Sequence, residues 1–322
     1  MLQETSLETT TIVGTPVPPI FKPTILELIP RFLQYAQFEL SLAPQTIAKY
    51  KENLLYTHRD IGTIPVTDIK LENVIAVKQK MFMRGCGESR VSQIVFALKG
   101  ILKFCAEVLE LPVMDQTRIK PPKHHRREVI FLTKEEIEQF VNSIKIDRKW
   151  QGKIRKKAVR INGLRFRTLV EVLLGTGMRI SEALSLDRGQ IDYEKAEAKI
   201  IGKGNKQRTV FFNQRSLDWV KYYLEQRSDT LEPIFITSRG TRFSREDVSG
   251  LFKRYVKKSG ITKHLTPHTL RHTMATHLLF NGCPINHVKE ILGHDRLETT
   301  CKYYLGVDKS KAKEAHKQFL NY

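Results

Sequence analysis

The chain has 322 residues, of which 41% are hydrophobic and 27% are charged, a composition that is typical of globular domains and argues against a disordered chain. Its length allows two domains, each with a buried core. The 54 Lys and Arg residues outnumber the 34 Asp and Glu residues, so the net charge of +20 indicates a polyanionic partner such as nucleic acid, although a generically basic protein has the same composition.

Cysteine spacing and hydropathy favour a cytoplasmic protein. No two of Cys86, Cys105, Cys283 and Cys301 have the short spacing of zinc ligands, so we expect reduced thiols and no metal site. The first residues lack the basic and apolar segments of a secretion signal, and the most apolar stretch, 91–111, carries charged side chains at helical spacing. We therefore expect no membrane span.

The N-terminal half predicts a small helical domain. Residues 1–20 are rich in Thr, Pro and Glu, which predicts a flexible tail. Within 21–117 apolar residues recur every three or four positions, and no segment alternates as a strand does. The predicted helices are one around 25–33 that Pro30 kinks or interrupts, one after Pro44, one over Leu71–Met83 with Thr67 as its N-cap candidate, and one from about Glu88 to Leu109.

Residues 118–130 have the composition of an interdomain linker. The run Arg118–Arg127 contains two prolines and several basic residues but no acidic residue, so it is a poor core former and is expected to be extended. Its charge suits a path along a DNA backbone, and a plain linker without DNA contact is the alternative.

Residues 131–322 predict a second domain that is mainly helical with a small sheet. It opens with a capping box at Thr133–Glu136. Two short β-like runs in 192–213 flank a Gly-Lys-Gly-Asn turn and predict a β-hairpin. The remaining predictions are a basic loop over 145–157, helical periodicity over Leu164–Leu186, and helices over Gln214–Gln226 and from Glu246 onward.

Six residues of the second domain form a candidate catalytic set, although each alone has an ordinary structural interpretation. Two guanidinium groups match the non-bridging oxygens of a phosphodiester in its transition state. A tyrosine can attack phosphorus once its proton is removed, and a lysine can protonate the leaving oxygen, so the chemistry requires no metal. The set is Arg179, Lys203, His268, Arg271, His294 and Tyr303.

The segments around these residues resemble the tyrosine recombinase/integrase family, especially its Xer-like members. The resemblance covers about residues 22–322, and 42–50 is similar to the first core-binding helix of that family. The matching motifs are Thr176-Gly-Met-Arg-Ile-Ser-Glu, Ile201-Gly-Lys-Gly-Asn-Lys-Gln-Arg, Thr266-Pro-His-Thr-Leu-Arg-His and Leu292-Gly-His-Asp-Arg-Leu-Glu-Thr-Thr-Cys-Lys-Tyr.

The resemblance implies a mainly α fold with a small β-sheet: an N-terminal helical core-binding (SAM-like) bundle and a C-terminal α+β catalytic domain. It implies site-specific recombination of DNA through a covalent 3′-phosphotyrosine and a Holliday junction, without metal, cofactor or ATP. The implied roles are a phosphate clamp for Arg179 and Arg271, general acid for Lys203, proton acceptor for His268, transition-state stabilisation for His294 and nucleophile for Tyr303.

The implied partner is double-stranded DNA at a specific inverted-repeat site, held between the two domains of each protomer, with four protomers on two paired sites. A homo-tetramer is expected, and a hetero-tetramer with a second recombinase is the alternative. The C-terminal segment 306–322, in which Lys309–Leu320 has an apolar helical face, is expected to dock on a neighbouring protomer. The expected location is the cytoplasm, in association with the nucleoid.

Three points stay open from the sequence. Tyr304 adjoins Tyr303, and only its spacing from His294 favours Tyr303 as the nucleophile. The basic stretch 145–163 is either an additional DNA contact or a solvated insertion. The competing functions are DNA relaxation in the manner of a type IB topoisomerase and DNA binding without catalysis, and both resolution of DNA dimers and integration of a mobile element fit the chain.

Overall fold

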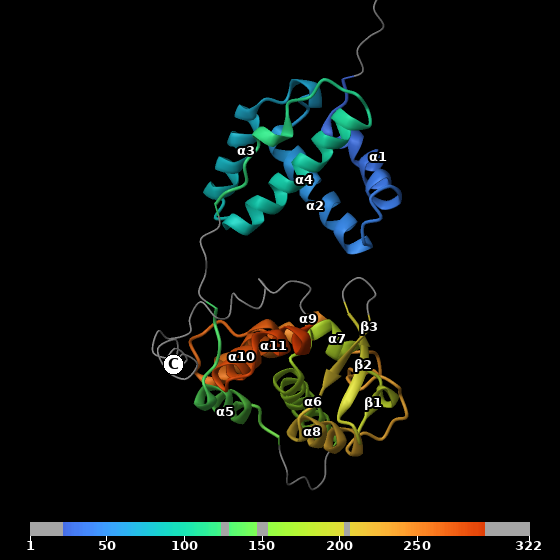
Figure 1. Cartoon of the computed structure of the whole chain (residues 1–322), viewed down its shortest axis with the longest axis vertical. Coiled ribbons are helices and arrows are strands. Elements are labelled where there is room, and N and C mark those ends of the chain that lie inside the picture. The colour runs from blue at the N-terminus through green and yellow to red at the C-terminus, as the bar shows by residue number, and fades with distance from the viewer. Residues whose placement is uncertain (1–21, 124–128, 147–153, 203–206, 294–322) are drawn as a thin grey trace, which may run out of the picture. The chain divides into compact units, whose positions relative to one another are not determined.

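A computed structural model describes residues 22–123, 129–146, 154–202 and 207–293, with the backbone alone for 154–160. The chain divides into two compact units between Arg126 and Arg127 (Figure 1). Unit 1 is the N-terminal part and unit 2 the C-terminal part.

Unit 1 is a helical bundle whose first helix begins at a capping box and whose second begins at a proline. The hydroxyl of Thr24 accepts a bond from the Glu27 N–H, and the Thr24 N–H donates to Glu27 Oε2 at 2.7 Å. Pro44 is the first residue of its helix, where a missing N–H has no cost. The elements are α1 (Ile25–Phe38, which runs through Pro30), α2 (Pro44–Ile61), the 3₁₀ turn η1 (Val66–Asp68), α3 (Leu71–Met83), α4 (Glu88–Glu107) and the 3₁₀ turn η2 (Gln116–Arg118).

The prediction that Thr67 is the N-cap of the third helix is wrong. Thr67 lies within η1, and its hydroxyl donates to Asp68 Oδ1 at 3.2 Å. The N-cap of α3 is Lys70, whose backbone N–H donates to the side chain of Asn73 at 2.8 Å. The additional turn before the helix, which the sequence pattern does not distinguish from a helix start, accounts for the error.

The core of unit 1 surrounds α4, which packs against α1, α2 and α3. A Cβ atom on Gly100, midway along α4, would lie 3.3 Å from ring atoms of both Phe32 and Tyr50, so the glycine lets the helices approach closely. These two rings meet edge to face with centroids 5.4 Å apart. Ile119, which belongs to the stretch with linker composition, is fully buried in this core.

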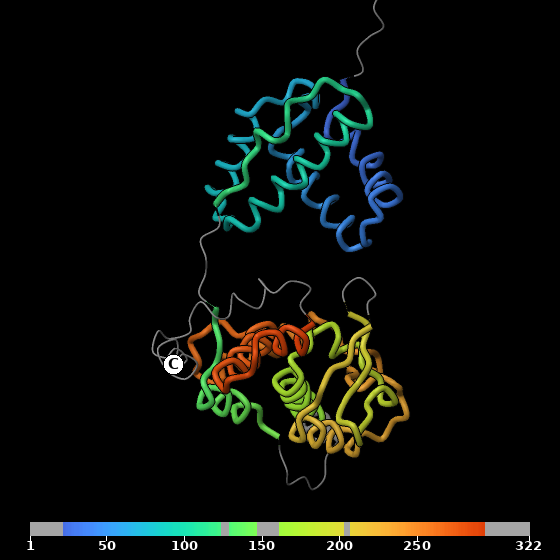
Figure 2. Tube along the Cα trace, viewed as in Figure 1, coloured from blue at the N-terminus to red at the C-terminus, as the bar shows by residue number. Residues whose placement is uncertain are grey.

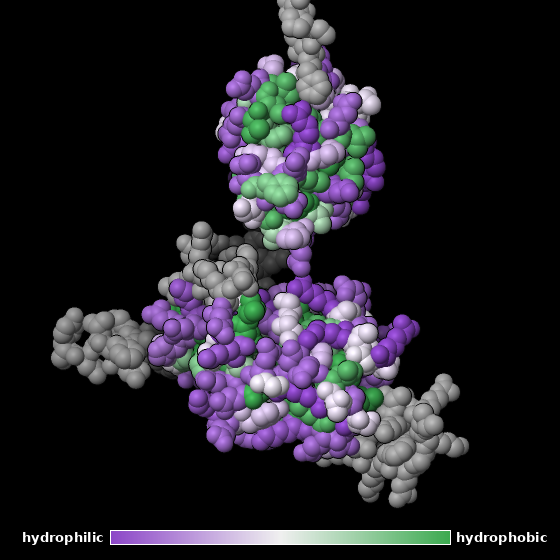
Figure 3. Space-filling model, turned by 90° about the vertical axis from the view of Figure 1, so that its right-hand side faces the viewer, coloured by the Kyte–Doolittle hydropathy of each residue, from purple (hydrophilic) through white to green (hydrophobic). Residues whose placement is uncertain are grey.

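On the face that Figure 3 shows, polar side chains predominate on unit 2, and apolar side chains appear at several places on unit 1. The exposed apolar residues of unit 1 include Phe38 and Met83, whose exposed fractions are 68% and 80%. None of the helices in the described part of the chain combines the length and the apolar character that crossing a bilayer requires.

Unit 2 is mainly helical with one small antiparallel sheet of order β1-β2-β3. Ala198 of β2 pairs with both Ile191 of β1 and Val210 of β3, so the structure adds a short strand to the predicted hairpin. The elements are α5 (Lys134–Ser143), α6 (Ile154–Thr176), α7 (Ile180–Ser185), the 3₁₀ turn η3 (Arg188–Gln190), β1 (Ile191–Asp192), β2 (Glu197–Ile201), β3 (Gln207–Phe211), α8 (Gln214–Glu225), α9 (Arg245–Ser259), α10 (Pro267–Phe280) and α11 (Ile285–Leu292).

Helix α6 forms the centre of unit 2. It packs against α8 on one side and α10 on another, and its residues between Leu164 and Leu173 contribute to the main core (Figure 2). The helix begins at Ile154, so the end of the stretch 145–157, which the sequence predicts as a loop, is helical. The predicted helical region from Glu246 onward consists of α9, α10 and α11 within the described residues, since left-handed turns at Gly260 and Gly282 interrupt it.

The chain enters unit 2 along α10. The N–H of Leu132 donates to the hydroxyl of Thr273 at 3.0 Å, and the carbonyl of Leu132 accepts a bond from the His277 ring at 2.8 Å. Thr273 and His277 lie one helical turn apart on α10. The segment that leads into α5 is therefore fixed to α10.

Replacement of Leu54, which is fully buried in unit 1, should destabilise the fold. Leu54→Ala leaves a cavity, so we expect the free energy of unfolding to fall by about 2–5 kcal/mol. Urea unfolding followed by circular dichroism measures the change. Leu55→Ala is the matched control, because Leu55 is 42% exposed and its truncation should change the free energy by less than about 0.5 kcal/mol.

Candidate active site

The turn between α6 and α7 places Arg179 at the start of α7. Gly177 has a φ of +62°, and a Cβ atom there would lie 3.0 Å from the Leu292 side chain, so both the conformation and the space require glycine. The Thr176 hydroxyl donates to the Val172 carbonyl at 2.6 Å and accepts from the Met178 N–H at 3.2 Å. The Thr176 hydroxyl thus links the last turn of α6 to Met178, which fixes the backbone of the turn before Arg179.

Arg179 is half-buried and is held by α7 and by the end of α11. Its Nη1 donates to Glu182 Oε1 at 2.8 Å, and its backbone N–H donates to Glu182 Oε2 at 2.7 Å. Its Nη2 donates to the Gly293 carbonyl at 3.2 Å. The guanidinium therefore has a fixed position and orientation.

Arg271 comes from the first turns of α10, which begins with the N-cap Thr266 and with Pro267 at the first position. The residue is 3% exposed. Its Nη1 donates to the Gly177 carbonyl and its Nη2 to the Leu292 carbonyl, each at 2.5 Å. Arg271 thus joins the turn before α7 to the C-terminal end of α11.

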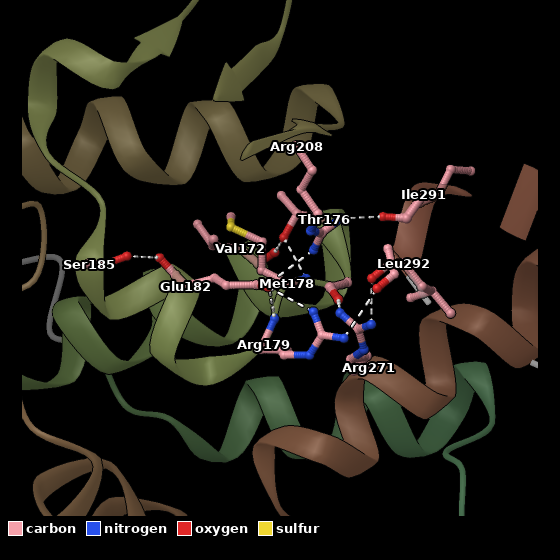
Figure 4. A network of polar contacts seen from close by, with 12 residues as sticks. Val172, Thr176, Met178, Arg179, Glu182, Ser185, Arg208, Arg271, Ile291 and Leu292 are labelled. Atoms are coloured by element: carbon pink, nitrogen blue, oxygen red, sulfur yellow. Dashed lines mark hydrogen bonds and ion pairs between the residues drawn. The ribbon is translucent and has the colours of Figure 1, made fainter. Parts of the chain in front are cut away.

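Arg208, on β3, is a third arginine in the same network. Its Nη1 donates to the Ile291 carbonyl at 2.8 Å and its Nη2 to Glu182 Oε2 at 2.9 Å. Figure 4 shows how the three guanidiniums gather around Glu182 and the end of α11. The sequence motif contains Arg208, but its type and spacing alone gave no reason to place it at the site.

Glu182 is the carboxylate that balances this group of arginines. Its side chain is 4% exposed and forms ion pairs with Arg179 and Arg208. Burial alone would raise the pKa of Glu182, but the bonds from the Arg179 backbone N–H and from Arg208 outweigh burial and lower this pKa. Sequence reasoning missed Glu182 as a site residue, and the available signal was its position three residues after Arg179, where a capping box places a carboxylate.

His268 and His272 lie one turn apart on α10, with stacked rings whose centroids are 6.5 Å apart. Burial and then the positive charges of Arg271, Arg179 and Arg245 lower the pKa of His268. Burial, then His268 and Arg271, lowers the pKa of His272 from 6.5 to about 4. Both rings are therefore neutral at pH 7, and a neutral imidazole can accept a proton.

Of the six predicted site residues, the structure brings together Arg179, His268 and Arg271, which come from two separate segments of the chain. The other three, Lys203, His294 and Tyr303, lie outside the described residues, as does Tyr304. Among the residues that the structure describes, no three His, Cys, Asp or Glu side chains form a group that could hold a metal ion.

Residues 130–311, more than half of the chain, match the phage integrase family. The tyrosine recombinase XerD of Staphylococcus saprophyticus is 27% identical over 301 residues, which cover 91% of this chain and 98% of that protein. The tyrosine recombinase XerC of Proteus mirabilis is 29% identical over 287 residues, 87% of this chain and 89% of that protein.

The fold is also similar to that of solved recombinases. The crystal structure of the XerH site-specific recombinase bound to a palindromic difH substrate, a post-cleavage complex, matches with a TM-score of 0.72 and 20% identity over 94% of this chain and 98% of that chain. The predicted fold class, a helical N-terminal domain and a mainly helical catalytic domain with a small sheet, is thus confirmed.

The low pKa of His272 predicts a specific loss of stability in acid. The unfolded chain binds a proton on this histidine near pH 6.5, whereas the folded chain does so only near pH 4, so stability is lost as the pH falls from 6.5 to 4. As the pH falls through this range, the melting temperature should decrease less for His272→Gln than for the wild type. His264→Gln is the control, because His264 is exposed. If the melting temperature changed equally with pH in all three proteins, the prediction would be contradicted.

Proposed function

The chain belongs to the phage integrase family and is a DNA strand-transfer enzyme of the tyrosine recombinase type, and we propose that it is a site-specific recombinase that cuts and rejoins double-stranded DNA through Tyr303. The observation that carries the proposal is the meeting of Arg179 and Arg271 beside the C-terminal end of α11. His294 follows this end directly in the sequence.

The two arginines suit a scissile phosphate. The contacts of Arg179 to Glu182 and Gly293 use two of the five N–H donors of its guanidinium, so the group can keep its position and still donate to a phosphate oxygen. Arg271 approaches from α10, so two guanidiniums from different directions can bind the two non-bridging oxygens. Since arginine stays ionised, the clamp works at any physiological pH.

The proposed cleavage moves one proton within the enzyme and transfers a second proton from the enzyme to the DNA. The phenolic oxygen of Tyr303 attacks phosphorus while its proton passes to a base, for which the neutral His268 is suited. The bond from phosphorus to the 5′ oxygen breaks, and Lys203 donates a proton to that oxygen. His294 stabilises the charge that develops on the phosphate. The product is a 3′-phosphotyrosine and a free 5′ hydroxyl, with no metal, cofactor or ATP.

The covalent bond explains how the strands are rejoined. A phosphotyrosine is a phosphodiester, so attack by a 5′ hydroxyl reverses the first step without an external energy source. Attack by the 5′ hydroxyl of another duplex exchanges strands, and two such exchanges proceed through a Holliday junction. We propose a tetramer of this chain on two inverted-repeat sites, bound with the help of its net charge of +20, on DNA in the cytoplasm.

The test of the proposal requires a binding site, which selection from a random duplex library by the full chain, followed by footprinting, provides. A nick placed near the cleavage point makes a suicide substrate, because the short product diffuses away and leaves the covalent adduct. We expect the wild type to form an adduct and Tyr303→Phe to form none, since phenylalanine lacks the attacking oxygen.

Tyr304→Phe is the matched control, because it removes the neighbouring hydroxyl from an adjacent position. It should form the adduct at a rate similar to the wild type. An adduct with Tyr303→Phe, or none with Tyr304→Phe, would show that the nucleophile is misassigned. Supercoiled plasmid relaxed by the wild type without recombinant products would favour the topoisomerase alternative.

A further inference from the structure

Three consecutive carbonyl oxygens at the end of α11 each accept a hydrogen bond from a different arginine. The Ile291 carbonyl binds Arg208, the Leu292 carbonyl binds Arg271 and the Gly293 carbonyl binds Arg179. The latter two arginines form the proposed phosphate clamp, whereas Arg208 has no role in that proposal. Its place in the network requires an explanation.

Arg208 lies near the described end of the β2–β3 ladder. It pairs with Ile200, and the next pair, Ile201 with Gln207, is the last one. On the inward face, Ile200 and Val210 are buried in the core of unit 2. Beyond Ile200, both residues of the last pair are exposed, and the exposed fraction of Ile201 is 65%. Among the described residues, Arg208 is therefore the polar side chain that holds this end of the hairpin to the rest of unit 2.

The fit around Arg208 is close. Its side chain is 15% exposed, and it joins β3 to Glu182 of α7 and to Ile291 of α11. A Cβ atom on Gly293 would lie 2.7 Å from Cδ of Arg208, so this position must be a glycine for the arginine to reach both partners. The contacts of Arg208 thus leave little freedom in the position of β3 relative to α7 and α11.

We propose that Arg208 is a positioning residue that fixes the β2–β3 hairpin against α7 and α11, so that Lys203, in the segment that joins the two strands, reaches the leaving 5′ oxygen. The inference rests on the proposed function. Arg208 does not act on the phosphate itself; it acts on the protonation of the leaving group. Its loss should therefore impair the same step as the loss of Lys203.

The chemistry of the leaving group makes this role measurable. In the ordinary substrate the bond from phosphorus to the 5′ oxygen breaks, and the oxygen takes the proton of Lys203. If sulfur replaces that bridging oxygen, the bond from phosphorus to sulfur breaks and a thiolate leaves, which is stable without a proton near neutral pH. The sulfur substrate therefore removes the need for the general acid and leaves the rest of the reaction unchanged.

The experiment measures single-turnover adduct formation on the nicked selected duplex, with either oxygen or sulfur at the cleaved bridging position. Arg208→Ala should form the adduct about 10²-fold more slowly than the wild type on oxygen, because a small displacement of a catalytic group has an effect of this size. It should approach the wild-type rate on sulfur. Lys203→Ala should show the same pattern, and the double variant should be no slower on oxygen than Lys203→Ala, because both changes affect one step.

Arg242→Ala is the matched control. Arg242 also joins a backbone carbonyl, that of Leu184 at 3.0 Å, to a carboxylate, that of Asp187 at 2.7 Å, but it holds no part of the β2–β3 hairpin. We expect wild-type rates on both substrates. Arg208→Lys keeps the charge beside Glu182 without the fork that reaches two partners, and it provides a second variant should Arg208→Ala not fold. It should be slowed on oxygen and not on sulfur.

Three results would overturn the proposal. Wild-type rates on oxygen for both Arg208 variants would show that the contacts have no role in catalysis. Equal losses on oxygen and sulfur would place Arg208 at the phosphate or in the stability of the fold instead. An absent adduct with the wild type itself would overturn the proposed function, and this outcome is distinct because it does not depend on Arg208.

Discussion

The C-terminal end of α11 is the point on which the geometry of unit 2 depends. The last carbonyls of a helix lack partners within the helix and carry a partial negative charge. Here three of them, from Ile291 to Gly293, are bound by guanidiniums that come from α10, from β3 and from the turn before α7. Each such interaction typically contributes about 0.3–1 kcal/mol at a surface and more when buried, in addition to the apolar cluster that α10 and α11 share.

The charges at this point do not cancel, and the imbalance suits the proposed chemistry. Arg179 and Arg208 pair with the carboxylate of Glu182, whereas Arg271 donates to carbonyl oxygens, including one at the helix end. Burial and then the positive charges of Arg271, Arg179 and Arg245 lower the pKa of His268, which keeps that ring neutral. The excess positive charge also favours an anion between the guanidiniums. The same electrostatic arrangement therefore prepares both the phosphate site and a proton acceptor.

The sequence predicted those parts of the molecule that local patterns determine. Leu71–Met83 was correctly assigned as a helix because its apolar periodicity stops before Gly85. Thr67 was incorrectly assigned as a cap because several polar residues precede that helix and only the backbone path distinguishes them. Arg179 and Arg271 could be found through their motifs. Arg208 could not, because its importance arises from partners more than 25 residues away in the chain, and spacing carries no information about such contacts. Glu182 was missed although its position three residues after Arg179 was an available signal.

The attachment of Leu132 to α10 has a mechanical consequence. Thr273 and His277 bind the N–H and the carbonyl of Leu132, a few residues after the division between the two units at Arg126 and Arg127. Arg271 lies on the same helix, two residues before Thr273. A force along the chain between the two units would therefore act first on α10, the helix that bears Arg271, which is proposed to bind the phosphate.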